Sequence, residues 1–159
     1  MKKFALSFLF IVVGLGSWAQ QPQIPMVNFS GLEPMLHKQT DTVYVVNFWA
    51  TWCKPCVEEL PHFLETAHEY KAQKVKFLFV SLDFPKQAET KLVPFVAEKM
   101  EGQAVILLND PAANSWIDKV SSDWSGAIPA TLVYRGTSRS FTEGTLSKTE
   151  LTELIKSKL

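Results

Sequence analysis

The sequence is 159 residues long, which suits one domain with a substantial core. Hydrophobic residues make up 47% of it and charged residues 20%, which is typical of a globular protein and not of a disordered chain. Sixteen basic residues balance sixteen acidic ones and no basic block stands out, so the charge pattern does not indicate nucleic-acid binding. The functional signal must therefore come from a local site.

The first segment has the pattern of an export signal. Two lysines precede a mostly apolar run at 4–16, and Ser17-Trp18-Ala19 places small residues at the positions that a signal peptidase reads. We expect residues 1–19 to be a cleavable signal peptide that directs the protein to the periplasm or cell envelope, and an uncleaved anchor is the alternative. Residues 20–41 are expected to form a lead-in with a short strand and one or two helical turns.

The next part of the chain alternates between two kinds of segment. Runs rich in β-branched and apolar residues predict buried strands at 42–50, 75–83 and 104–110. Each run precedes a segment of helical composition, at 54–72, 86–100 and 111–120. Alternation of this kind predicts parallel βαβ units.

The end of the chain departs from this alternation. Segments 130–136 and 138–144 are strand-like and meet at Gly136, which predicts an antiparallel pair. A final amphipathic helix should begin after Ser147, because Glu150 stands at the capping-box spacing from it. The whole pattern predicts an α/β fold with a central mixed sheet and helices on both faces.

Two further residues carry local expectations. Pro94 lies inside the predicted 86–100 helix and should kink or split it, because proline has no N–H to donate. Asp83 ends the 75–83 strand, and we expect it to cap a helix or to hold a loop.

The two cysteines of the chain, Cys53 and Cys56, stand where the first predicted strand gives way to a helix. A thiol in the first turn of a helix faces unpaired N–H groups and the positive end of the helix dipole, so the pKa of Cys53 should fall. Lys54 adds a positive charge, and Pro55 fits the first turn because no N–H is needed there. The spacing allows Cys53 to attack a partner disulfide and Cys56 to resolve the mixed disulfide.

Angles around this helix distinguish the residues that follow. At about 100° per residue, Cys56 lies on the buried arc, and we place Cys53 at the exposed mouth of the site. Glu59 lies at the edge of the arc, one turn from Cys56, where partial desolvation would raise its pKa and let it exchange protons with the thiols. The alternative for Glu59 is an ordinary surface glutamate. Glu58, Glu65 and Glu69 lie on the opposite, solvated side.

Other readings of the cysteine pair remain open at this point. A zinc site needs about four ligands, and the nearest histidines, His62 and His68, lie about 240° apart around the helix. We therefore expect no metal. A structural disulfide in a non-catalytic protein-binding module is the main alternative, although so short a loop gives little stabilisation.

With these residues in view, the chain resembles the thioredoxin-like superfamily, and within it the exported thiol-disulfide oxidoreductases of the TlpA/ResA type. The resemblance covers roughly residue 43 to the end and rests on "VVNFWATWCKPCVEELP" and "GAIPAT". It implies a thioredoxin-like domain over 42–159 whose redox group is the Cys53–Cys56 disulfide, with no other cofactor.

The resemblance also implies roles for single residues. Glu59 would assist thiol chemistry, and Pro129 would be a cis-proline facing the disulfide, in a loop that contacts the partner's chain. The residues that line the site or bind the partner would be Trp52, Lys54, Pro55, Ile128 and Pro129. Asn47 stands where thioredoxins proper carry a buried aspartate, and because asparagine cannot carry a proton, that task shifts to Glu59.

The partners are implied in the same way. Many members of the resembling group act as reductants, for example on the apoprotein thiols of cytochrome c before haem attachment, or in redox homeostasis of the cell envelope. We therefore expect exported protein clients, a membrane thiol donor upstream, and a monomeric protein.

Overall fold

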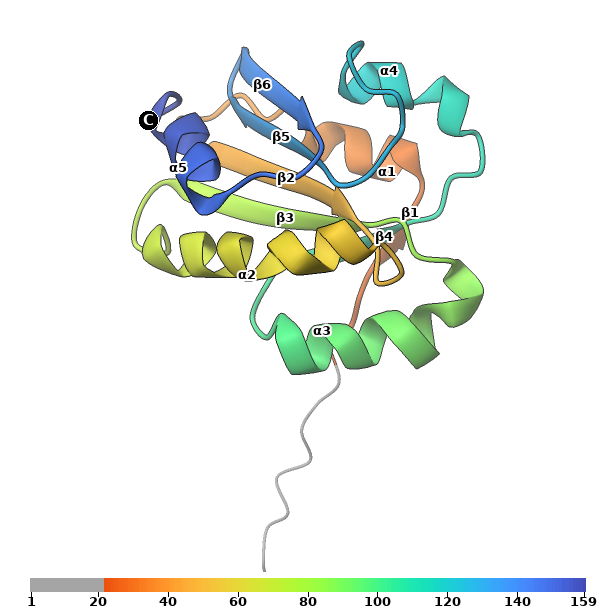
Figure 1. Ribbon diagram of the computed structural model, residues 1–159. Helices are drawn as coiled ribbons and strands as arrows, with labels where there is room; N and C mark the ends of the chain where they lie inside the picture. The colour runs from red at the N-terminus through yellow and green to blue at the C-terminus, as the bar shows by residue number, and fades with distance from the viewer. Residues whose placement is uncertain (1–21) are drawn as a thin grey trace, which may run out of the picture.

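The computed structural model describes residues 22–159, so the predicted signal peptide at 1–19 lies outside the described residues. A six-stranded sheet forms the centre of the fold, in the order β1-β4-β3-β2-β5-β6 (Figure 1). The strands are β1 (Met26–Val27), β2 (Val43–Trp49), β3 (Val75–Ser81), β4 (Val105–Leu108), β5 (Ala130–Arg135) and β6 (Ser138–Glu143).

The direction of the strands follows the predicted pattern. β1, β4, β3 and β2 pair in parallel, and β5 pairs antiparallel with both β2 and β6. β2 is buried along its whole length, as its run of β-branched and aromatic residues, with almost no polar break, indicated. The mixed sheet and the antiparallel pair around Gly136 are confirmed.

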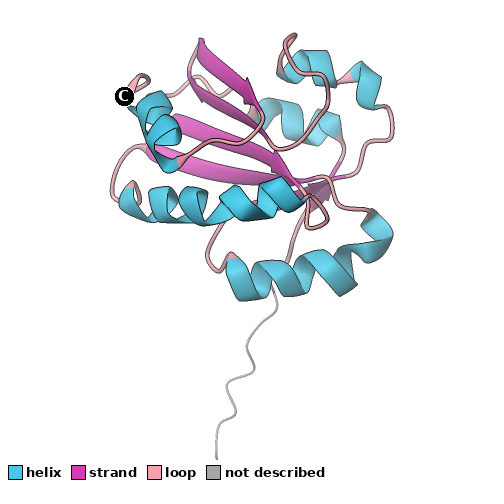
Figure 2. Ribbon diagram, viewed as in Figure 1, coloured by secondary structure: helices cyan, strands magenta, loops and turns pink. Residues whose placement is uncertain are grey.

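Helices cover both faces of the sheet (Figure 2). They are α1 (Phe29–Leu32), α2 (Lys54–Glu69), α3 (Val93–Lys99), α4 (Ile117–Val120) and α5 (Lys148–Lys156). The capping box of α5 is present, with Ser147 accepting from the Glu150 N–H and the Glu150 carboxylate accepting from the Ser147 N–H. The predicted 86–100 helix is split: a 3-10 turn and a wider turn precede α3, and Pro94 lies in the first turn of α3, where its missing N–H costs nothing.

The sheet separates two cores. One core lies against α2, α3 and α5, and Cys56, Phe63 and Leu151 are among its buried residues. The other lies against α1 and α4 and is rich in aromatic rings, including those of Phe29 and Trp116. Burying each large apolar side chain stabilises the fold by about 1.5–3 kcal/mol. Within residues 22–159, no helix has the length and apolar character needed to cross a bilayer.

Candidate active site

The redox pair lies where β2 passes into α2, at the carboxyl end of a central parallel strand. Cys53 is the N-cap of α2, and its backbone is extended, with φ −87° and ψ 100°. It forms a disulfide with Cys56, whose Cα lies 5.3 Å away. The Cys56 N–H points at the Cys53 sulfur from 3.4 Å. In the reduced protein this N–H and the dipole of the 16-residue helix would both stabilise a Cys53 thiolate.

The prediction that Cys53 stands at an exposed mouth is wrong. Cys53 is 5% exposed and Cys56 is 1% exposed, so both are buried. The helix angles are right only in that Cys53 is the more exposed of the two. The cover comes from the loop before β5, where the Ile128 carbonyl oxygen lies 3.7 Å from the Cys53 sulfur. Helix angles describe a helix by itself, and this loop is 75 residues away in the chain.

The loop over the disulfide contains the predicted cis-proline. The Ile128–Pro129 peptide bond is cis, which confirms the expectation drawn from the resemblance. Two hydrogen bonds hold this loop: the Trp124 indole N–H donates to the Ala127 carbonyl at 2.7 Å, and the Gly144 N–H donates to the Pro129 carbonyl at 2.8 Å. Pro129 leads directly into β5, so the sheet fixes the loop beside the cysteines.

Glu59 is a buried carboxyl on the core side of α2, 4% exposed. Its Oε1 accepts from the Asn47 side-chain amide at 3.1 Å, and its Oε2 accepts from the Leu146 N–H at 2.9 Å. Burial raises the pKa of Glu59 to about 7, although both hydrogen bonds act in the opposite direction. The prediction of a desolvated glutamate with a raised pKa is confirmed. A carboxyl with this pKa both takes and gives protons near neutral pH.

Asn47 orients Glu59 from the sheet. The Asn47 amide donates to the Thr131 hydroxyl at 3.2 Å as well as to Glu59, and Thr131 lies opposite Asn47 in the β2–β5 pairing. Asn47 was expected to be unable to carry a proton, but its contact with Glu59 was not predicted. Thr131 and Leu146 were not predicted either, because these residues lie 84 and 87 positions from their partners and no local pattern marks them.

The remaining predicted residues lie on the outer side of the site. Trp52 is 55% exposed, and its ring stacks on that of Phe84, with centroids 6.1 Å apart. Phe84 was not predicted. Lys54 and Pro55 are exposed in the first turn of α2, and the Lys54 ammonium lies 3.6 Å from the Glu58 carboxylate. The solvated positions of Glu58, Glu65 and Glu69 are confirmed.

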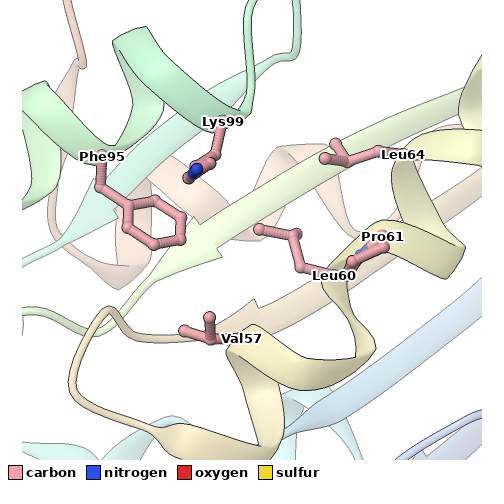
Figure 3. Close-up of a pocket in the computed structure, with 6 residues that line it drawn as sticks. All are labelled: Val57, Leu60, Pro61, Leu64, Phe95 and Lys99. Carbon is pink, nitrogen blue, oxygen red and sulfur yellow. The ribbon is translucent and has the colours of Figure 1, made fainter.

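An apolar groove lies beside the site, between α2 and α3 (Figure 3). Its volume is about 330 Å³, and it is lined by Val57, Leu60, Pro61, Leu64, Phe95 and Lys99. Neither cysteine and no carboxyl group lines it, so it is not where the thiols react. Among residues 22–159, no group of three or more histidine, cysteine or acidic side chains lies together as a metal site.

Comparisons with known sequences agree with this geometry. The model of the AhpC/TSA family matches residues 19–135. The thiol-disulfide oxidoreductase ResA of Geobacillus kaustophilus is 29% identical over 148 residues, which cover 91% of this chain and 78% of that protein. The thioredoxin-like protein YneN of Bacillus subtilis is 27% identical over 145 residues, covering 90% of this chain and 81% of its own.

Solved structures show the same fold. A thioredoxin-related protein from Neisseria meningitidis serogroup B superposes with a TM-score of 0.58 at 26% identity, over 76% of this chain and 86% of that one. A thiol:disulfide interchange protein from Chlorobium tepidum superposes with a TM-score of 0.62 over 74% of this chain and 80% of that one. At 19% identity, the second likeness shows the fold alone.

Proposed function

The chain belongs to the AhpC/TSA family and is a thioredoxin-like thiol-disulfide oxidoreductase, and from this premise we propose that it reduces disulfides of exported proteins through Cys53 and Cys56. One observation carries the proposal: the Cys53–Cys56 disulfide lies at the N-terminus of α2, under the cis-Pro129 loop and on the same helix as the buried Glu59. No cofactor other than this disulfide takes part.

The reaction begins from the reduced protein. The Cys53 thiolate attacks one sulfur of the client disulfide; a mixed disulfide forms, and the first client thiolate leaves and takes up a proton. Cys56 then loses its proton and attacks the Cys53 sulfur, which releases the second client thiolate, and this thiolate also takes up a proton. The client gains two electrons and two protons, and the protein ends with the Cys53–Cys56 disulfide.

Glu59 is proposed to accept the proton that Cys56 loses. Its place one turn after Cys56 and its pKa of about 7 support this role, because such a carboxyl is partly ionised at neutral pH. The cis-Pro129 loop is proposed to receive the client. The Ile128 carbonyl already lies at the Cys53 sulfur, so a client sulfur that bonds to Cys53 must approach alongside this loop.

The direction of electron flow rests on the resemblance to the TlpA/ResA group, many of which reduce. The test is the reduction potential, measured by equilibration with glutathione. A potential near that of thioredoxin, about −270 mV, supports a reductant fed by an upstream membrane thiol donor. A potential near that of DsbA, about −120 mV, contradicts it.

Export is proposed from residues 1–19 and gives the clients their location in the periplasm or cell envelope. The measurement is the mass of the protein recovered from the cell envelope fraction. A mature chain that begins at Gln20 supports cleavage after Ala19, and a full-length chain held in the membrane supports the anchor instead.

The activity is tested with a protein disulfide as substrate and dithiothreitol as the source of electrons. We expect the Cys53→Ser variant to lose catalysed reduction. The Cys56→Ser variant, produced in cells and isolated without added thiol, should accumulate a mixed disulfide that identifies the client. If Cys53→Ser and the wild type reduce the substrate at the same rate, the proposed function is wrong.

A further inference from the structure

Asp83 is a buried carboxyl that the reaction described above does not use. It lies just beyond the end of β3 and is 2% exposed. Its Oδ1 accepts from the Thr51 hydroxyl at 2.5 Å and from the Thr51 N–H at 3.3 Å. Its Oδ2 accepts from the same N–H at 3.1 Å and from the Ser81 hydroxyl at 2.7 Å. Both carboxylate oxygens therefore accept hydrogen bonds, and most of these come from Thr51, in the loop before Cys53.

Packing alone does not explain a carboxyl at this place. A carboxyl removed from water costs free energy unless hydrogen bonds replace its hydration, and an apolar residue of similar size fills a buried space at lower cost. The contacts of Asp83 satisfy this need, and they converge on Thr51, two residues before Cys53. The carboxyl is placed to hold that loop.

Neighbouring contacts join the same two segments in register. The Leu82 N–H donates to the Trp49 carbonyl at 2.8 Å, one step beyond the last β2–β3 pair. The Phe84 ring stacks on Trp52. These two contacts and the hydrogen bonds that Thr51 donates to Asp83 keep the segments after β2 and β3 aligned beyond the end of the sheet. The Cys53 N–H then closes the turn by donating to the Ala50 carbonyl at 3.1 Å.

We propose that Asp83 is a positioning residue for Cys53, which it places through Thr51. The need for it differs between the two redox states. In the oxidised protein the covalent bond to Cys56 holds the Cys53 sulfur at the helix N-terminus. In the reduced protein that bond is absent. The loop contacts, together with the helical bond from the Val57 N–H to the Cys53 carbonyl at 3.1 Å, then keep the Cys53 sulfur within reach of the Cys56 N–H. Asp83 therefore acts on the state in which Cys53 attacks.

This inference rests on the proposed function, in which Cys53 is the attacking thiol. If the loop is released, the Cys53 thiolate loses its fixed N–H donor, so the pKa of Cys53 rises and its attack slows. An effect of the Asp83 charge alone has the opposite sign: removal of a nearby negative charge favours the thiolate and lowers the pKa of Cys53. The two causes are therefore separable.

The test compares Thr51→Val with Thr66→Val in the reduced, full-length protein. Each variant loses one hydroxyl that donates a hydrogen bond, that of the half-buried Thr51 or that of the buried Thr66. The Thr66 hydroxyl donates to the His62 carbonyl within α2 at 2.7 Å and lies outside the loop. The readouts are the pH dependence of Cys53 alkylation by iodoacetamide and the rate of attack on oxidised glutathione. We expect Thr51→Val to raise the pKa of Cys53 and to slow attack about tenfold at pH 7. Thr66→Val should leave both readouts at the wild-type level.

Two more variants complete the test. Thr51→Ser keeps the hydroxyl and should restore most of the rate that Thr51→Val loses. Asp83→Asn should raise the pKa of Cys53, as Thr51→Val does, although it removes a negative charge. A lowered pKa of Cys53 in Asp83→Asn would overturn the proposal in favour of a charge effect.

Equal readouts for Thr51→Val and Thr66→Val would also overturn the proposal, because Asp83 would then contribute only to stability. This holds even if both variants unfold at a lower denaturant concentration than the wild type. Failure of the proposed function is a separate result: it shows as activity in Cys53→Ser, whatever the Thr51 variants do. If Asp83→Asn does not fold, the Thr51 pair still decides between the two outcomes.

Discussion

The two faces of the sheet hold different kinds of core. On the face covered by α2, α3 and α5, apolar residues surround the disulfide, and the polar contact from Asn47 to Glu59 is buried with them. On the face covered by α1 and α4, aromatic rings pack on one another: the Phe29 ring stacks on Trp116 with centroids 5.7 Å apart, and Trp116 lies 5.7 Å from Trp124. We call these the redox face and the aromatic face.

This difference indicates that the redox face carries the chemistry and that the aromatic face supports the fold. Buried polar groups lower stability unless every hydrogen bond is made, so their concentration on the redox face indicates a function that requires them. On the aromatic face, the half-buried Arg139 donates to the carbonyls of Leu36 and Val120 and thereby ties down the ends of two helical segments. Substitutions on the two faces should therefore have different consequences.

The largest expected effect on stability is on the aromatic face. Phe29→Ala removes a ring that is 4% exposed and leaves a cavity against Trp116, so we expect the free energy of unfolding to fall by about 3–5 kcal/mol. Urea unfolding measures this. The rate of Cys53 alkylation in the folded, reduced variant should equal that of the wild type. A change in that rate would show that the two faces are not separate.

The next effect concerns Glu59 and depends on pH. Its pKa is about 7 in the folded protein against 4.5 ordinarily, so the folded state favours the protonated form. The stability that this provides is complete below about pH 4.5 and is lost as the pH rises through 7. Between about pH 4.5 and pH 7, the free energy of unfolding of the wild type should fall by about 3 kcal/mol relative to that of Glu59→Gln, whose side chain does not titrate.

The measurement is urea unfolding of the oxidised wild type and Glu59→Gln from pH 4 to pH 8. All other groups titrate in both proteins, so the difference between the two curves isolates Glu59. Curves that stay parallel over this range would contradict the raised pKa and remove the main distinction of the redox face.

A smaller effect should come from the cap of α5. Ser147→Ala removes the side-chain acceptor for the Glu150 N–H and should lower the free energy of unfolding by about 1 kcal/mol. The neighbouring Leu146 N–H donates to Glu59, so this variant also tests whether the cap holds that N–H in place. Near pH 7, where Glu59 titrates, we expect the pH dependence of the free energy of unfolding to match that of the wild type, because the Ser147 hydroxyl lowers the pKa of Glu150 and not that of Glu59. A displaced inflection near pH 7 would show that the α5 cap holds the Leu146 donor to Glu59 in place.

How far the sequence predicts the site depends on the distance between partners along the chain. Cys56 and Glu59 share a helix, so its angles placed Cys56 on the buried arc and Glu59 at the edge of that arc. The burial of Cys53 depends on a loop 75 residues away, and the contacts of Asp83 with Thr51 span 32 residues. Hydrophobic periodicity in the sequence does not predict contacts between residues so far apart in the chain. The cis bond before Pro129 followed from the resemblance and not from any local pattern.

The same reasoning applies to the fold. The buried strand β2 and the capping box of α5 are local features, and both were predicted. The two extra turns before α3 were not predicted beyond a break at Pro94, because their form depends on tertiary packing: Leu92, the last residue of the wider turn, is buried in the redox-face core.

The role of Glu59 is tested by the pH dependence of the disulfide-exchange rate in wild type and Glu59→Gln, measured in the same single-turnover assay. The wild-type profile should contain an inflection near pH 7 that Glu59→Gln lacks, and the variant should react about 10–100-fold more slowly at pH 7. Profiles that superimpose at every pH would contradict proton transfer by Glu59 and leave its burial unexplained by the chemistry.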